Sequence, residues 1–145
     1  MSKSPEVTYI DTSVIVSYVD EADPNHEKAV ALVSGISGRR VVSRLTLAEL
    51  ASVYSRAGLG DPLPLAIYSV KRVGAELVEV DFNEVLKEAF ARAPALKLKT
   101  LDLLHVVACS RAGCSEFATL DADVIRRADS IRESLNIRVL APPRF

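Results

Sequence analysis

Short apolar runs and longer amphipathic segments alternate along this chain. Runs rich in β-branched residues predict five strands, at residues 7–10, 41–43, 77–80, 117–120 and 137–140. Between them, apolar residues at helical spacing predict helices over residues 13–20, 24–36, 46–57, 65–74, 82–93, 100–112 and 121–134. This alternation in 145 residues indicates a single α/β domain over residues 1–145, a three-layer α/β/α sandwich with a mainly parallel central sheet.

An aspartate interrupts the first apolar run, VTYIDTSVIV, at Asp11. Burying a carboxylate is unfavourable unless hydrogen bonds, a paired charge or a metal ion stabilise it. Asp11 comes directly after the first predicted strand, and ligands of parallel sheets bind in the crevice beyond the carboxyl ends of the strands. We therefore expect Asp11 to face a ligand in that crevice.

Three further carboxylates occupy comparable positions, and each also has a simpler explanation. Glu49 could complete a capping box with Thr46, Asp102 could complement a helix dipole, and Asp121 could be an N-cap. Asp11 itself could close an Asx-turn through the amide two residues on. Glu49 and Asp121 follow the second and fourth predicted strands, so they too should face the crevice, whereas the helix of Asp102 follows no obvious strand.

A cluster of these carboxylates would be suited to a divalent cation. Carboxylates within about 4–6 Å of one another repel and raise each other's pKa, so they need a compensating charge. Mg²⁺ prefers oxygen ligands and uses few carboxylates while it keeps several waters. Such an ion activates water and neutralises charge that develops on a phosphate.

Composition limits the possible partners and the expected location of the protein but identifies no ligand. The formal net charge is −1, from 18 basic and 19 acidic residues, so any polyanionic partner must be attracted by local basic patches. No apolar run is long enough to cross a bilayer and no secretory signal is evident at the start, so the cytoplasm is the expected location. Cys109 and Cys114, in CSRAGC, lack the spacing and the further ligands of a zinc site, and we expect them to pack as small hydrophobes.

Four segments in this order, YIDTSVIV, LTLAEL, KTLDLLHVVA and FATLDADV, resemble the PIN-domain nucleases. In particular the chain looks like the compact toxin ribonucleases of VapBC-type toxin–antitoxin pairs. The resemblance implies the PIN-domain fold and a Mg²⁺- or Mn²⁺-dependent endoribonuclease with Asp11, Glu49, Asp102 and Asp121 as catalytic residues. Asp11, Asp102 and Asp121 would hold the metal, directly or through water, while Glu49 would orient metal-bound water. It also implies a homodimer and a small antitoxin protein that occludes the acidic site.

Further residues have supporting roles in this interpretation. Ser13 would give a hydroxyl to the network, and Thr119 or Asp123 would support the metal ligands. His105 shares a helix face with Asp102 and could contact substrate, but a buried histidine with a backbone partner is the more common situation. Basic residues near the expected crevice could bind RNA phosphates, above all Lys99 or Arg44, and further Lys97, Arg126 and Arg127.

Two other functions fit parts of the sequence. A PIN module without toxin activity could process RNA or bind a partner. An α/β phosphatase also places an aspartate after its first strand, but it needs a second aspartate two residues on, where this chain has Ser13. The patterns GxGxxG and GxxxxGK[ST] are absent, which disfavours a dinucleotide site and a P-loop.

Overall fold

Five parallel strands form the centre of the protein, in the spatial order β3-β2-β1-β4-β5. The computed structural model describes residues 6–143. The strands are β1 Val7–Ile10, β2 Arg39–Val42, β3 Ala75–Leu77, β4 Glu116–Ala118 and β5 Arg138–Leu140. The helices are α1 Thr12–Val19, α2 His26–Ser34, α3 Arg44–Arg56, α4 Pro62–Arg72, α5 Phe82–Leu96, α6 Thr100–Arg111, α7 Ala122–Arg126 and α8 Ala128–Leu135.

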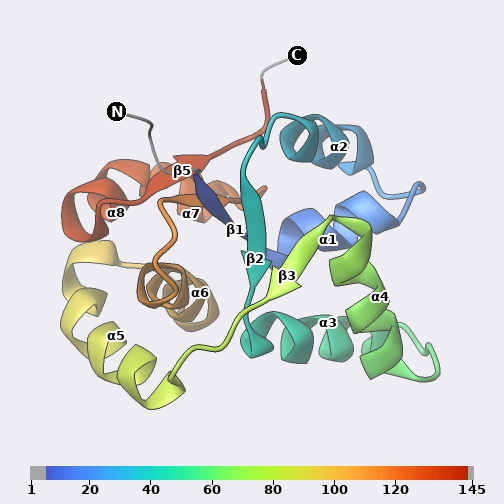
Figure 1. Ribbon diagram of the computed structural model, residues 1–145, viewed down its shortest axis with the longest axis horizontal. Helices are drawn as coiled ribbons and strands as arrows, with labels where there is room; N and C mark the ends of the chain where they lie inside the picture. The colour runs from blue at the N-terminus through green and yellow to red at the C-terminus, as the bar shows by residue number, and fades with distance from the viewer. Residues whose placement is uncertain (1–5, 144–145) are drawn as a thin grey trace.

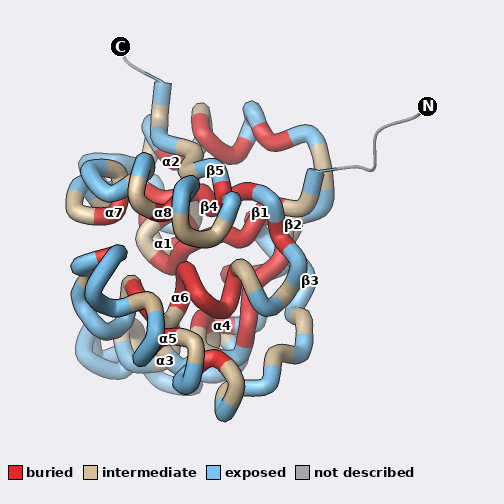
Figure 2. Tube along the Cα trace, turned by 90° about the vertical axis from the view of Figure 1, so that its left-hand side faces the viewer, coloured by how far each residue is buried: buried red, intermediate tan, exposed pale blue. Residues whose placement is uncertain are grey.

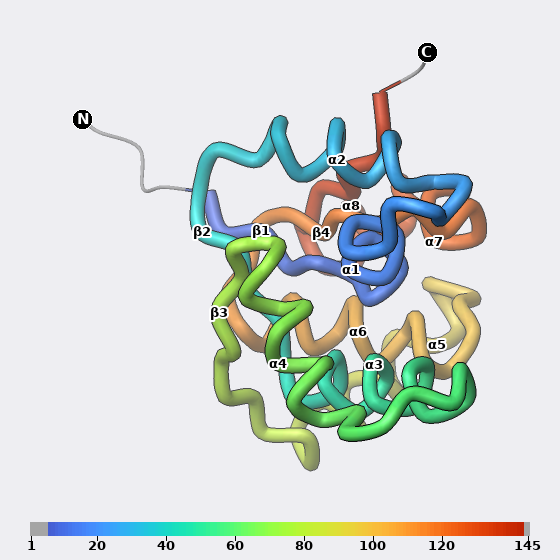
Figure 3. Tube along the Cα trace, turned by 90° about the vertical axis from the view of Figure 1, so that its right-hand side faces the viewer, coloured from blue at the N-terminus to red at the C-terminus, as the bar shows by residue number. Residues whose placement is uncertain are grey.

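Helices cover both faces of this sheet, which confirms the predicted three-layer sandwich (Figure 1). Helices α5, α6 and α8 lie on one face, and α1, α2 and α4 lie on the other. Figure 3 faces the second layer and shows α1 between α2 and α4. The chain passes from β2 straight into α3, which lies beyond the end of that strand (Figure 1).

Successive side chains along a strand point to opposite faces of the sheet, which explains how both faces can be apolar. In β1, Tyr9 packs into the cluster beneath α5 and α6, while its neighbour Ile10 packs into the cluster beneath α1 and α4. Phe117 in β4 stacks on Tyr9, with ring centroids 5.6 Å apart. Figure 2 shows β1 and α6 as mostly buried segments. A sheet covered on both faces requires apolar residues on both sides of its strands, and here every strand ends in apolar residues, whereas the charged residues lie at or near the strand starts.

The order of the strands creates a switch point between β1 and β4. From β1 the chain builds β2 and β3 outward on one side, then returns to place β4 and β5 on the other. The backbone N–H of Asp11 donates to the carbonyl of Ala118 at 2.9 Å, so the carboxyl ends of β1 and β4 remain joined. In parallel sheets generally, ligands bind at such a point, where the connections leave in opposite directions.

Several element boundaries differ from the sequence prediction. The third strand is Ala75–Leu77 rather than 77–80, because its partner β2 ends at Val42, opposite Leu77. The predicted helix over 121–134 is interrupted at Arg127, whose N–H bonds the carbonyl of Val124, three residues back, so that α7 ends there.

Helix α5 continues through Pro94, which the sequence prediction placed after its end. Proline removes one backbone donor, whose acceptor in a regular helix would be the carbonyl of Phe90, and Phe90 is highly exposed. The helix instead ends at Lys97, which adopts a left-handed conformation and donates its N–H to Ala93.

Two expectations from composition can be compared with the structure. Cys109 and Cys114 are free and buried, as small hydrophobes would be. Within residues 6–143, no helix has both the length and the apolar character needed to cross a membrane.

Candidate active site

Asp11 is buried where β1 ends and α1 begins, with 5% of its surface exposed. Its Oδ2 accepts hydrogen bonds from the hydroxyls of Thr119 at 2.7 Å and Ser13 at 3.0 Å. The Asx-turn suggested by the sequence does not form, since no backbone amide caps this carboxylate. Burial raises the pKa of Asp11, and the charge of Glu49 adds to this effect, while His105 and the two hydroxyls oppose it.

Thr119 and Ser13 join the ends of β1 and β4 around this carboxylate. The Thr119 hydroxyl donates to Asp11 and accepts from the backbone N–H of Asp121 at 3.0 Å. The Ser13 hydroxyl accepts from the backbone N–H of Leu120 at 3.2 Å. Asp121 also caps α7, because its Oδ1 accepts from the backbone N–H of Asp123 at 2.9 Å. Capping and a place at the crevice therefore coincide in Asp121.

Glu49 reaches the site from α3, but not as the sequence prediction had it. Helix α3 begins at Arg44, with Ser43 as N-cap, and the N–H of Ser43 meets the hydroxyl of Thr46 at 3.4 Å. The predicted capping box between Thr46 and Glu49 is therefore wrong, because the extended backbone of Ser43 starts the helix earlier. Glu49 lies one turn further along, and its Oε1 accepts from Nε2 of His105 at 2.9 Å.

His105 connects Glu49 to a chain of buried hydroxyls. Its Nδ1 lies 2.8 Å from the Tyr9 hydroxyl, which lies 2.7 Å from the Ser43 hydroxyl. Burial raises the pKa of Tyr9 far above its ordinary value, so this hydroxyl keeps its proton. A carboxylate only accepts, so Nε2 carries a proton and Nδ1 can accept the proton of Tyr9. The chain of donors then runs from Ser43 through Tyr9 and His105 to Glu49.

This arrangement bears on the predicted contact between His105 and substrate. The ring is 1% exposed and both of its nitrogens are engaged, so His105 lies beneath the site as a buried histidine. Its partners are side chains rather than the backbone partner expected from the sequence. Tyr9, Ser43 and Thr46 were missed by sequence reasoning. The available signal was that a tyrosine in a buried strand needs a hydrogen-bond partner for its hydroxyl.

At Glu49, hydrogen bonds and electrostatic attraction lower the pKa, whereas burial raises it. Burial alone would raise its pKa, but the hydrogen bond from His105 and the charge of Arg56 lower it overall. The Thr12 hydroxyl lies near enough to lower this pKa further, although it makes no hydrogen bond of normal geometry. Glu49 is therefore held as a carboxylate, with about a quarter of its side chain exposed.

Asp102, in the first turn of α6, completes the group. Its pKa rises to about 6, because it is half-buried and because the negative charges of Asp121, Asp11 and Glu49 act on it. Ligand atoms of Asp11 and Glu49 lie within 4.8 Å of one another, Thr119 links Asp11 to Asp121, and the charges of all three act on Asp102, so carboxylates from separate parts of the chain come together here. We call Asp11, Glu49, Asp102 and Asp121 the acidic cluster.

The raised pKa of Asp102 predicts a pH dependence of stability. The metal-free folded protein binds this proton more tightly than the unfolded chain does, so the stability from Asp102 falls as pH rises from about 4 to about 6. Asp102→Asn should remove this part of the pH dependence, leaving the smaller pH dependence that other groups produce. Thermal melts of both proteins in chelator across this range provide the measurement. Identical pH profiles would contradict the interaction among the carboxylates.

The residues present suit a divalent cation. Within residues 6–143, no lysine or arginine forms a salt bridge with Asp11, Asp102 or Asp121. Ligand atoms of Asp11, Glu49 and His105 lie within 4.8 Å of one another, but the hydrogen bonds of His105 leave the carboxylates as the available ligands. The buried Thr12 hydroxyl has no hydrogen-bond partner among the described residues. Uncompensated carboxylates with neighbouring hydroxyls form the oxygen-rich donor set that Mg²⁺ prefers.

The predicted basic and supporting residues are distributed around this cluster. Arg44, at the start of α3, is paired with Glu79 at 3.2 Å, with both side chains exposed. Asp123 is paired with Lys99 at 3.5 Å and with Arg126, so its carboxylate meets cations rather than joining the acidic cluster. Lys99 is the N-cap residue of α6 and remains 82% exposed. Their predicted roles in RNA binding and metal support stay predictions.

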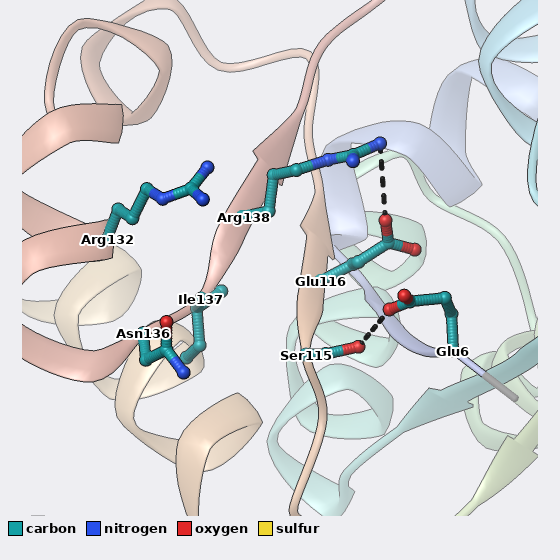
Figure 4. A pocket seen from close by; sticks show the side chains of 7 residues that line it. All are labelled: Glu6, Ser115, Glu116, Arg132, Asn136, Ile137 and Arg138. Atoms are coloured by element: carbon teal, nitrogen blue, oxygen red, sulfur yellow. Dashed lines mark hydrogen bonds and ion pairs between the residues drawn. The ribbon is translucent and has the colours of Figure 1, made fainter. Parts of the chain in front are cut away.

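A hollow lies at the other end of the strands, where β1, β4 and β5 begin (Figure 4). Its charged groups are largely satisfied from within: Arg138 pairs with Glu116 at 3.4 Å, and Ser115 donates to Glu6 at 2.5 Å. Thr8 also donates to Glu116 at 2.9 Å. These contacts hold the starts of the strands together, whereas Asp11, Asp102 and Asp121 form no salt bridge with a lysine or arginine of residues 6–143 and belong to the ends where ligands of such sheets bind.

Residues 8–130 match the PIN domain, and because this match covers most of the chain, the chain belongs to the PIN-domain family. The resemblance stated from the four acidic segments is thereby confirmed. A comparison with curated proteins gave no match.

Solved structures of low sequence identity share the fold over nearly the whole chain. VapC20 of Mycobacterium tuberculosis, a sarcin–ricin loop cleaving toxin, has a TM-score of 0.67 at 14% identity, with coverage of 90% of this chain and 98% of that chain. VapBC-1 from nontypeable Haemophilus influenzae has a TM-score of 0.65 at 13% identity, with coverage of 93% and 97%. FitAcB from Neisseria gonorrhoeae has a TM-score of 0.61 at 17% identity, with the same coverages. The fold is therefore the one found in VapC-type toxins.

Proposed function

We propose that this chain is a divalent-metal-dependent endoribonuclease and the toxin of a VapBC-type toxin–antitoxin pair. The observation that carries the proposal is the acidic cluster at the switch point of the sheet. Within residues 6–143, Asp11, Asp102 and Asp121 form no salt bridge with a lysine or arginine, and burial together with the other carboxylates raises the pKa of Asp102. Keeping several carboxylates together costs stability, which makes sense where a cation compensates them.

The residues of the acidic cluster have distinct proposed roles. Asp11, Asp102 and Asp121 would hold Mg²⁺ or Mn²⁺, which when bound supplies an activated water and neutralises charge developing on the phosphate. Ser13 and Thr119 fix Oδ2 of Asp11 and thereby orient this side chain. Glu49, with Oε1 fixed by His105, presents its other oxygen as an acceptor that orients the attacking water.

We predict that Mg²⁺ or Mn²⁺ both activates and stabilises the protein. RNA should be cleaved with either ion and remain intact in chelator, and the ion should raise the melting temperature because it relieves repulsion among the carboxylates. At 100 times its Kd, an ion would stabilise the fold by about 2.7 kcal/mol. Cleavage that continues in chelator, or a melting temperature that neither ion changes, would contradict the proposed metal centre.

The proposal of a homodimer and an antitoxin rests on exposed apolar surface and on the likeness to VapBC-1 and FitAcB. Helix α4 and the turn before it expose Leu59, Leu63, Ile67 and Tyr68, by 41–57%. Such a patch is typical of a protein–protein interface. An antitoxin that reaches the crevice would inhibit by placing a cation, such as an arginine, among the carboxylates.

Growth after expression separates a toxin from a PIN module without toxin activity. A toxin arrests growth of its host, and co-expression of the small protein encoded beside it restores growth. RNA cleavage without growth arrest would favour an RNA-processing role. Cellular RNA as the substrate makes the cytoplasm the proposed location.

A further inference from the structure

A hollow of about 240 Å³ is lined by residues that neighbour Asp102 and Asp121 of the acidic cluster in the sequence. Its lining comes from the segment between α5 and α6 and from α7, and consists of Lys97, Leu98, Lys99, Asp123, Arg126 and Arg127. Lys99 directly precedes α6, whose first turn carries Asp102, and Asp123 lies two residues beyond Asp121. The same two elements therefore supply both the hollow and two members of the acidic cluster. We call it the basic hollow.

Positive charge is in excess in the basic hollow. Lys99 and Arg126 both bind Asp123, through Oδ2 at 3.5 Å and through Oδ1. Lys97 and Arg127 are exposed, and neither forms a salt bridge with any of residues 6–143. The lining thus holds four cations and one carboxylate, in a protein whose formal net charge is −1. Two of these cations are held in place by Asp123, and two are available to an anion.

The backbone around the basic hollow is fixed at helix ends. Lys97 caps the end of α5, where its N–H donates to Ala93 at 3.0 Å. The carbonyl of Lys99 accepts the N–H of Leu103 at 2.8 Å in the first turn of α6. Cations that project from fixed backbone lose less entropy when they bind a ligand than cations on a mobile loop.

We propose that the basic hollow binds backbone phosphates of single-stranded RNA beside the bond to be cleaved. This inference rests on the proposed nuclease function, because the acidic cluster repels RNA and the strand needs cations on its flank. No aromatic side chain of residues 6–143 lines the basic hollow, so these residues offer the bases on that flank no ring on which to stack. The contact is therefore with phosphates and is tolerant of sequence.

RNA binding by an inactive protein tests the inference without turnover. In the Asp11→Asn background, fluorescence anisotropy measures the Kd for labelled single-stranded RNA of about 12 nucleotides. Adding Lys97→Gln and Arg127→Gln should raise the Kd about tenfold and lower the salt slope by about 1.4, because two phosphate contacts are lost. The matched control, Lys28→Gln with Arg72→Gln, removes an exposed lysine and an exposed arginine from α2 and α4 and should change neither quantity.

A second double variant separates charge from structure. Lys97→Arg with Arg127→Lys keeps both cations and should bind RNA within about twofold of the unmodified background. Equal binding by the glutamine variant and its control, or absence of RNA binding altogether, would overturn the inference. So would equal loss in the glutamine and the charge-retaining variants, because the positions would then matter for shape rather than for charge.

The two proposals can fail separately. If the unmodified chain cleaves RNA while the glutamine variant binds as tightly as its control, only the basic hollow is wrong. If the chain cleaves no RNA with either ion, yet the glutamine variant loses binding, the nuclease function is wrong and the basic hollow stands as an RNA-binding site.

Discussion

Replacing Asp11 with asparagine is expected to lower RNA cleavage on the order of 10³-fold while leaving the fold intact. Asparagine has the same shape, and its amide oxygen can accept the hydroxyls of Ser13 and Thr119 that now bind Oδ2. It has no charge with which to hold a divalent cation. Cleavage assays with Mg²⁺ and Mn²⁺ measure this effect, with Asp81→Asn, at the exposed start of α5, as the matched control.

The same substitution should stabilise the metal-free protein. Burial raises the pKa of Asp11. At pH values above the ordinary pKa of aspartate, the charged carboxylate is therefore less favourable in the folded protein than in the unfolded chain. Asparagine removes the charge and with it this cost. Thermal melts in chelator near neutral pH should therefore give a higher melting temperature for Asp11→Asn than for the unmodified protein. Full activity in the variant would contradict the assignment of the site, whatever the melts show.

The edge of the sheet that carries the site was predictable because parallel strands follow a simple rule. Carboxyl ends of parallel strands meet at one edge, so residues that follow the first and fourth strands had to lie near each other. Asp11 and Asp121 follow β1 and β4, and Thr119 bridges them in the structure. The periodicity of apolar residues also predicted the two covered faces, since alternate strand residues enter opposite clusters.

The contacts of Glu49 could not be predicted in the same way. They depend on where α3 begins, and the sequence analysis considered a cap at Thr46, whereas Ser43 is the N-cap in the structure. They also depend on the rotation of α6, which brings His105 inward. Helix α6 follows α5 rather than a strand, so no sheet register fixed its placement in advance. Local sequence patterns indicate which polar residues could belong to a site. Tertiary packing determines which of them come into contact.

Replacing His105 with alanine is expected to lower RNA cleavage about 10–100-fold, as loss of a group that orients a metal-site carboxylate does. His105 holds Oε1 of Glu49 through Nε2 and is itself held by Tyr9. Without the imidazole, Glu49 can rotate away from the other carboxylates. Because the ring is 1% exposed, RNA cannot touch it, so kcat should fall while KM changes little. Steady-state kinetics on a defined RNA measure both constants.

Two further variants distinguish positioning of Glu49 from simple packing. His105→Gln keeps an N–H that can reach Glu49 and should recover part of kcat, although it cannot restore the link to Tyr9. Tyr9→Phe leaves the link between His105 and Glu49 but removes the donor to Nδ1, so it should cost about 1–3 kcal/mol of stability and little activity. A rise in KM in the alanine variant would instead indicate that His105 contacts RNA. Loss of stability alone, with both kinetic constants unchanged, would show that His105 contributes only to packing and that Glu49 does not need His105 for its orientation.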